Sequence, residues 1–290
     1  MSGVVSVHLM GGLGNQLFQV FAALSYALEN EYTLIMPYSE KLTTGHVRNT
    51  YWDSFLKELK KYTNISLPIT TQQLFSLPTL REQSFTYVPF PKMNELKTEN
   101  LLLFGYFQSY KYFEKNKQQL FELIRLEEQK EEIEEKYLKN KSLSVSMHFR
   151  FGDYKKIQDC HPLMTVEYYK KALLTSIRNE KLDTSITILY FCEEEDNELV
   201  NTIIQELKNT TTGKNVVFEK VSDTLTDWEQ MLLMSVCNYN IIANSSFSWW
   251  GAHFNNHSNK IVCYPSVWFG PKMSKDVSDL FPEEWIKITA

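Results

Sequence analysis

Three side chains that could bind an anionic substrate stand together at the end of one predicted strand. Residues 143–150 alternate, so that apolar side chains face one way while His148 and Arg150 face the other way with two serines. Asp153 follows in the next turn, close enough to pair with either of them. A guanidinium can bind phosphate oxygens in a planar fork and neutralise charge that grows on a departing diphosphate. The alternative interpretation is a structural cluster that only ties a loop to a sheet.

A second candidate site follows a buried strand at 240–243, where small polar side chains lead into a predicted helix. These residues are Asn244, Ser245, Ser246, Phe247 and Ser248. One of the serines could cap the helix, whose free N–H groups could then bind an anion. The pattern alone favours the simpler interpretation, a serine cap with two core tryptophans packed behind it.

A third candidate is a glycine-rich loop between a strand at 4–10 and a helix that begins near Leu17. Its residues are Gly11, Gly12, Leu13, Gly14, Asn15 and Gln16. Glycines let a backbone approach a ligand closely, and the two amides supply donors. The Walker pattern fails because no Lys-Ser or Lys-Thr closes the loop. The dinucleotide fingerprint fails at Leu17, which occupies the third glycine's place, so a nicotinamide-dependent enzyme is disfavoured but stays open as an alternative.

Four adjacent acids, Glu193, Glu194, Glu195 and Asp196, follow the predicted strand at 186–192. They could hold a metal ion, but such a run at a helix start is more often a solvated turn favoured by the helix dipole. The cysteines are scattered, without the spacing of a zinc site, and are interpreted as free thiols. The sequence therefore predicts no metal site and no cofactor.

The elements that would position these residues alternate regularly in the second half of the chain. Strands are predicted at 143–150, 186–192, 215–218, 240–243 and 260–264, with helices at 166–177, 197–207, 227–237 and from about 248. This alternation predicts an α/β fold with a parallel sheet covered on both faces, and ligands bind beyond the carboxyl ends of such strands. Residues 37–91 are irregular, and the charge-rich stretch 127–141 predicts a solvated helix near a boundary between domains 1–138 and 139–290.

Composition excludes several classes of protein. Among 290 residues, 43% are hydrophobic and 22% charged, as in an ordinary globular chain. A net charge of −5 argues against the broad basic face of a protein that binds nucleic acid without sequence preference. Because no signal peptide or long apolar segment is visible, the chain is expected to be soluble, in the cytoplasm or elsewhere, without a membrane anchor.

Taken together, three motifs resemble the α-1,2-fucosyltransferase family, glycosyltransferase family 11. They are the glycine loop with its flanks at 10–19, the His-Phe-Arg-Phe-Gly-Asp-Tyr run at 148–154, and the stretch 241–252 with its Asn-Ser-Ser-Phe-Ser-Trp-Trp-Gly-Ala run. The last of these is the most specific, and the order and spacing cover nearly the whole chain.

The resemblance implies two Rossmann-like domains facing a cleft, the GT-B type, with GDP-fucose held mainly by the second and a galactose-containing acceptor by the first. It implies an inverting, metal-independent transfer to a hydroxyl, expected to be the galactose 2-hydroxyl. Arg150 would bind the β-phosphate and His148 the nucleotide or phosphate. Asn15, with Gly12, Gly14 and Gln16, would reach the sugar diphosphate across the cleft, and residues 244–247 would line the donor pocket.

The match departs from the family pattern at two places. Phe151 stands where a second arginine is expected. Either this change removes a contact to phosphate, or Phe151 packs in an apolar pocket of its own. An acid is expected at Gln230, for which Asp227 or Glu229 could substitute. A non-catalytic protein that binds a GDP-sugar or a glycan is therefore a further alternative. The general base stays unassigned, since Asp153 could equally orient Arg150.

Overall fold

The computed structural model of the chain describes residues 3–43, 45–92, 95–96, 98–138 and 143–290. It divides into two compact units, which are called unit 1 (Met1–Glu127 with Asp276–Pro282) and unit 2 (Glu128–Lys275 with Glu283–Ala290). The division between the units falls at 127/128 rather than at the expected 138/139, so residues 128–138, expected in the first domain, belong to unit 2. Residues 276–282, expected in the second domain, belong to unit 1.

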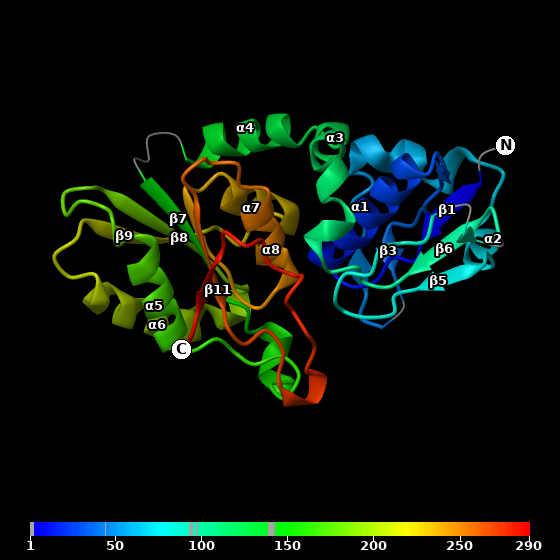
Figure 1. The fold of residues 1–290 in the computed structure, drawn as a ribbon. Coiled ribbons are helices and arrows are strands. Elements are labelled where there is room, and N and C mark those ends of the chain that lie inside the picture. Colours follow the sequence, from blue (N-terminus) through cyan, green and yellow to red (C-terminus); the bar gives the residue numbers. More distant parts are fainter. Residues whose placement is uncertain (1–2, 44, 93–94, 97, 139–142) are drawn as a thin grey trace. The chain divides into compact units, whose positions relative to one another are not determined.

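Unit 1 is built on a parallel four-stranded sheet in the order β2-β1-β6-β5 (Figure 1). The strands are β1 Val4–Val7, β2 Thr33–Leu34, β5 Thr79–Arg81 and β6 Leu101–Phe104. Helix α1, Leu13–Glu29, follows β1 as expected and is buried over most of its length because it packs on the sheet. Unit 1 also contains an antiparallel pair of β3 Lys41–Leu42 and β4 Arg48–Asn49, the helices α2 Thr71–Phe75 and α3 Lys117–Leu123, and several short 3-10 helices.

Unit 2 contains a parallel six-stranded sheet in the order β12-β11-β10-β7-β8-β9. Its strands are β7 Leu143–His148, β8 Ile186–Phe191, β9 Val216–Lys220, β10 Tyr239–Ile241, β11 Ile261–Pro265 and β12 Ile286–Ile288. The helices are α5 Val166–Ser176, α6 Asn197–Thr210, α7 Asp227–Ser235 and α8 Ser246–His253. Helices α5 and α6 cover one face of the sheet, and α7 and α8 cover the other (Figure 1). The expected α/β fold with Rossmann-like parallel sheets is confirmed.

The alternation predicted for β7 is visible in the packing of its two faces. Val145 and Met147 belong to the apolar cluster under α5 and α6. Ser146 faces the other way and accepts a hydrogen bond at 2.7 Å from the amide of Asn240, which also donates to the carbonyl of Met234 on α7. The side chains at even positions of this strand therefore face α7 and α8, and those at odd positions face the core beneath α5.

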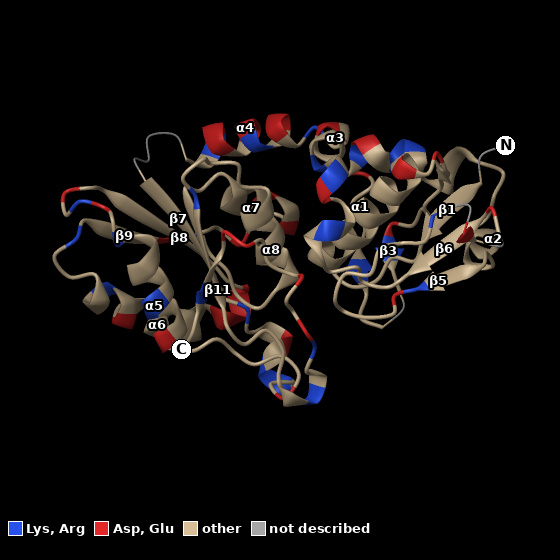
Figure 2. Ribbon diagram, in the orientation of Figure 1, with Lys and Arg blue, Asp and Glu red and all other residues tan. Residues whose placement is uncertain are grey.

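Helix α4, Leu126–Tyr137, carries the charge-rich stretch and contains the boundary between the units. Figure 2 shows acidic and basic residues interspersed along it, as expected for a solvated face. No helix among the described residues is both long and apolar enough to cross a membrane. The cysteines Cys160, Cys192, Cys237 and Cys263 are all free thiols.

Candidate active site

The strand order in the sheet of unit 2 reverses between β7 and β10. From β7 the chain proceeds through β8 to the edge at β9, then returns to the other side of β7 as β10, which pairs with it at Ile241 and Met147. In open α/β sheets the crevice at such a switch point, beyond the carboxyl ends of the strands, is where ligands bind. His148 ends β7 and is followed by Arg150, while β10 leads into 244–247. The topology therefore brings the first two candidate motifs together at one point of one sheet.

His148 is held neutral at this point. Its side chain is on the α8 face, its ring lies 5.4 Å from that of Phe247, and the residue is only 7% exposed. Burial, aided by the positive charge of Arg150, lowers the pKa of His148 to about 3. Its Nδ1 is buried without a hydrogen-bond partner among the described residues. A neutral imidazole here can exchange one hydrogen bond with a ligand but supplies no positive charge to a phosphate.

Arg150 supplies the positive charge. Its guanidinium is paired with the carboxylates of Asp153, in the following turn, and Glu193, just beyond β8. The side chain is 18% exposed. Burial alone would lower the pKa of Arg150, but the attraction of Glu193 and Asp153 outweighs it and raises the pKa. The predicted partnership of Arg150 with Asp153 is present, and it gives Asp153 an orienting contact.

Sequence reasoning missed the aromatic contacts of this arginine. The guanidinium carbon of Arg150 lies 4.8 Å from the ring centre of Tyr154, a cation–π contact. The other neighbour of Tyr154 is His161, whose ring is stacked at 4.5 Å and nearly parallel. The hydroxyl of Tyr154 donates to the backbone oxygen of Asn244 at 3.4 Å, which ties the loop after β7 to the loop after β10. The tyrosine's position next to the His-x-Arg motif was the only signal available for it.

The loop after β10 combines a helix cap with an anchoring amide. Ser245 is the N-cap of α8, accepting a hydrogen bond from the N–H of Phe247 at 3.3 Å, while Ser246 begins the helix. Asn244 is 2% exposed and its amide donates to the carbonyls of Pro162 and Trp268 at 2.9 and 3.2 Å. Its N–H groups therefore hold two loops in place, its buried Oδ1 has no hydrogen-bond partner among the described residues, and the contribution of residues 244–247 to a donor pocket stays a prediction.

The side chain of Phe151 lies in the apolar core of unit 2. It is 2% exposed and belongs to the apolar cluster under α5, with its ring 6.0 Å from that of Phe149. The alternation of β7 explains this, because odd positions face that core. Of the two expectations for this position, the apolar pocket is confirmed.

Asp227 follows the edge strand β9 rather than β7 or β10. It begins α7, after the edge strand β9, is exposed, and accepts a hydrogen bond from the N–H of Trp228 at 2.8 Å. Glu229 is bound to the backbone and hydroxyl of Thr226 at the helix start. Gln230 donates to the carbonyl of Leu225 at 3.0 Å. All three side chains thus make local contacts at the start of α7.

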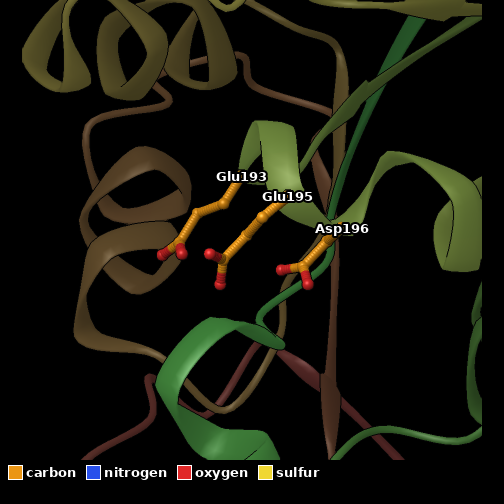
Figure 3. Close-up of side chains that lie close together, drawn as sticks. All are labelled: Glu193, Glu195 and Asp196. Carbon is orange, nitrogen blue, oxygen red and sulfur yellow. The ribbon is translucent and has the colours of Figure 1, made fainter.

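Three of the acids after β8 lie close together (Figure 3). Carboxylate oxygens of Glu193, Glu195 and Asp196 lie within 4.8 Å of one another, a spacing that could hold a cation. Glu193 is, however, paired with Arg150, and the buried Asp196 with Lys155. Asp196 also accepts a hydrogen bond from the N–H of Gly152 at 2.8 Å. Two of these three carboxylates therefore already have a cationic partner and tie the loop after β7 to the end of β8.

In unit 1 the glycine loop occupies the equivalent switch point, between β1 and β6. Gly11 has φ +76°, a conformation that favours glycine. Gly12 caps α1, and a Cβ there would meet no atom within 4 Å, which leaves space for a ligand; Gly14 is buried in the first turn. Asn15 is partly buried, and its Oδ1 accepts from the amide of Gln108, beyond β6, at 2.6 Å.

Gln16 does not face that space. It is 1% exposed, and its amide donates to the carbonyls of Gly11 and Asn49 at 3.0 and 2.8 Å. Both N–H groups of the Gln16 amide are thus used to brace the loop, and a contact of Gln16 with substrate stays a prediction. Gly12 and Asn15 stay the better candidates of this group.

Comparison with known proteins identifies relatives over nearly the whole chain. The chain is 29% identical over 98% of its length to the alpha-1,2-colitosyltransferase of Escherichia coli, covering 99% of that protein. It is 26% identical over 97% of its length to the O-antigen biosynthesis glycosyltransferase WbnK of Escherichia coli, again covering 99%. Solved structures with some likeness include a mutant of Arabidopsis thaliana FUT1 in complex with GDP (12% identity, 89% of this chain and 69% of that chain, TM-score 0.47). Another is the fucosyltransferase NodZ from Bradyrhizobium (10% identity, 87% and 93%, TM-score 0.44). The model of glycosyl transferase family 11 matches residues 1–289, and the chain belongs to that family.

Proposed function

We propose that this glycosyltransferase moves L-fucose from GDP-fucose to a hydroxyl of an acceptor glycan, the 2-hydroxyl of a galactose, with inversion at the anomeric carbon. The observation that carries the proposal is the position of Arg150, a cation at the switch point of a parallel sheet, against Tyr154, whose hydroxyl binds the loop that precedes α8. A diphosphate leaving group needs such a preorganised positive charge where its own negative charge grows. The proposal includes a GT-B arrangement in which unit 2 binds the donor and unit 1 the acceptor.

In this mechanism Arg150 binds the β-phosphate and stabilises the departing GDP. The neutral His148 donates or accepts one hydrogen bond at the nucleotide or phosphate, and Asp153 keeps the guanidinium oriented. The N-terminal end of the α8 dipole adds a favourable electrostatic contribution. Gly12 and Asn15 contribute from unit 1. No general base is assigned, because a loose, oxocarbenium-like transition state lowers the demand for one.

The donor sugar has one specific rival. The colitosyltransferase is a relative over nearly the full length of both chains. Colitose differs from fucose by the absence of the 3-hydroxyl, so both donors would present the same nucleotide and diphosphate to Arg150. The choice between them depends on contacts to the sugar, which makes it a question for a donor screen.

We also propose that the transfer needs no metal ion or other cofactor. The pairing of Glu193 with Arg150 and of Asp196 with Lys155 supports this, because a cation bound there would have to displace both ion pairs. Arg150 can neutralise the leaving group in the place of a metal.

The experiment is a donor screen in excess EDTA. GDP-fucose, GDP-colitose, GDP-mannose and UDP-galactose are each incubated with a panel of galactosides, and nucleotide release is compared with and without acceptor. Acceptor-dependent release of GDP from GDP-fucose is expected. Preference for GDP-colitose would replace GDP-fucose as the proposed donor, and activity restored only by magnesium or manganese would overturn metal independence. Binding of GDP-fucose without release of GDP would favour a non-catalytic binding protein.

A further inference from the structure

The pairing of Arg150 with Glu193 has a consequence for donor affinity. Glu193 is not in the motif that contains Arg150: it stands beyond β8, the neighbouring strand, and is 52% exposed in its side chain. Asp153, by contrast, is three residues along the same loop. Two carboxylates from two different strand ends therefore bind one guanidinium.

The two contacts use different nitrogens. Nη1 of Arg150 donates to Glu193, and Nη2 donates to Asp153. One face of the same guanidinium lies against the ring of Tyr154. A phosphate binds arginine through the same planar N–H groups that bind a carboxylate. A diphosphate that approaches Arg150 must therefore compete with acids already bound to it.

The local charge points in the same direction. Arg150 faces two carboxylates, and the nearby Lys155 is matched by the buried Asp196. The cluster thus has more negative than positive charge, which is unfavourable for an incoming diphosphate. Asp153 is held near Arg150 by the short loop that joins the two residues. Glu193 has an exposed side chain, which can move away from Arg150 into solvent without losing much of its hydration.

We infer that Glu193 is a positioning residue that sets the affinity for the donor: it holds Arg150 in the empty site, yields it to the diphosphate, and takes it back as GDP leaves. This inference rests on the proposed function, since it requires Arg150 to bind the diphosphate. The inference predicts that mutation of Glu193 increases the affinity for GDP. Loss of a residue that only supports the fold would weaken GDP binding.

The test is calorimetric titration of GDP into wild type, Glu193→Gln and Glu195→Gln. Glutamine keeps the length and polarity of the side chain but removes the competing charge. Glu195 is the matched control, an exposed acid in the same turn, with the same charge change and with no contact to Arg150 among the ion pairs described. A carboxylate a few Å from a bound phosphate repels it even in a solvated site, and the glutamine variant removes that repulsion. Glu193→Gln should therefore lower the Kd for GDP about tenfold, equivalent to about 1.4 kcal/mol, against less than about threefold for Glu195→Gln.

A second measurement separates this role from a general electrostatic effect. Stopped-flow displacement of a fluorescent GDP analogue should show slower release from Glu193→Gln than from either other protein. An unchanged or weaker affinity for GDP in Glu193→Gln, or an equal gain in both variants, would overturn the inference while leaving GDP binding itself intact. Failure of all three proteins to bind GDP would instead overturn the proposed function, and the inference with it.

Discussion

Replacement of His148 by glutamine should change how stability depends on pH. In the folded chain burial, together with Arg150, lowers the pKa of His148 to about 3, against 6.5 for a free histidine. A lowered histidine pKa makes the unfolded state the better proton acceptor, so its stabilising effect is complete above pH 6.5 and is lost as the pH falls toward 3. From 6.5 to 5 the difference is 1.5 pH units, and at about 1.36 kcal/mol per unit the loss is about 2 kcal/mol at pH 5. At pH 7 the loss of stability is close to zero.

The assay is urea denaturation of wild type and His148→Gln at pH 5, 7 and 8. Between pH 7 and 5 the free energy of unfolding of wild type should fall by about 2 kcal/mol more than that of the variant. His8 and His161 also have lowered pKa values because of burial, but both are present in the two proteins and cancel in the difference. The comparison of pH 7 with pH 8 is the control, where both proteins should change equally. Parallel stability curves from pH 7 to 5 would refute a neutral, buried His148.

Substitutions at three positions test the site further. Arg150→Ala should cut transfer at least a hundredfold, because loss of a preorganised charge at a leaving group costs about 3 kcal/mol, and Arg150→Lys should fall well below wild type too; wild-type turnover in either would remove the residue from the mechanism. Phe151→Arg should lower the melting temperature without improving GDP affinity, since an unpaired cation would be buried; tighter GDP binding at unchanged stability would place the position in the donor site. Asn244→Ala should cost about 2 kcal/mol of unfolding free energy by leaving two carbonyls without a donor, and an unaltered denaturation curve would contradict that anchoring role.

The sequence was most informative where residue alternation and element order acted together. Period-two alternation in 143–150 correctly predicted that His148 and Arg150 share a face, and the same rule accounts for the inward turn of Phe151. The order of strands and helices predicted a parallel sheet, although strand order in space was not available from it. The switch point between β7 and β10 therefore emerged only with the structure.

What was missed had weak local signals or depended on partners distant in sequence. Strands β5, β6 and β12 have only three or four residues each, and β5 lies in a stretch with no periodicity. The pairing of Glu193 with Arg150 joins positions 43 residues apart, which a run of acids does not indicate. Gln16 was expected to supply donors and Asn244 to line the donor pocket, yet both side chains are buried with backbone carbonyls as hydrogen-bond partners.

The most direct test of the proposed function is the linkage of the reaction product. The chain is incubated with GDP-fucose and a β-galactoside in EDTA, and the product is analysed by two-dimensional NMR. The account predicts a single new fucosyl residue in the α configuration, inverted from the donor, with a through-bond correlation from its anomeric proton to C2 of galactose. A fucosyl residue of retained configuration, or no fucosylated product while another nucleotide sugar is transferred under the same conditions, would contradict it.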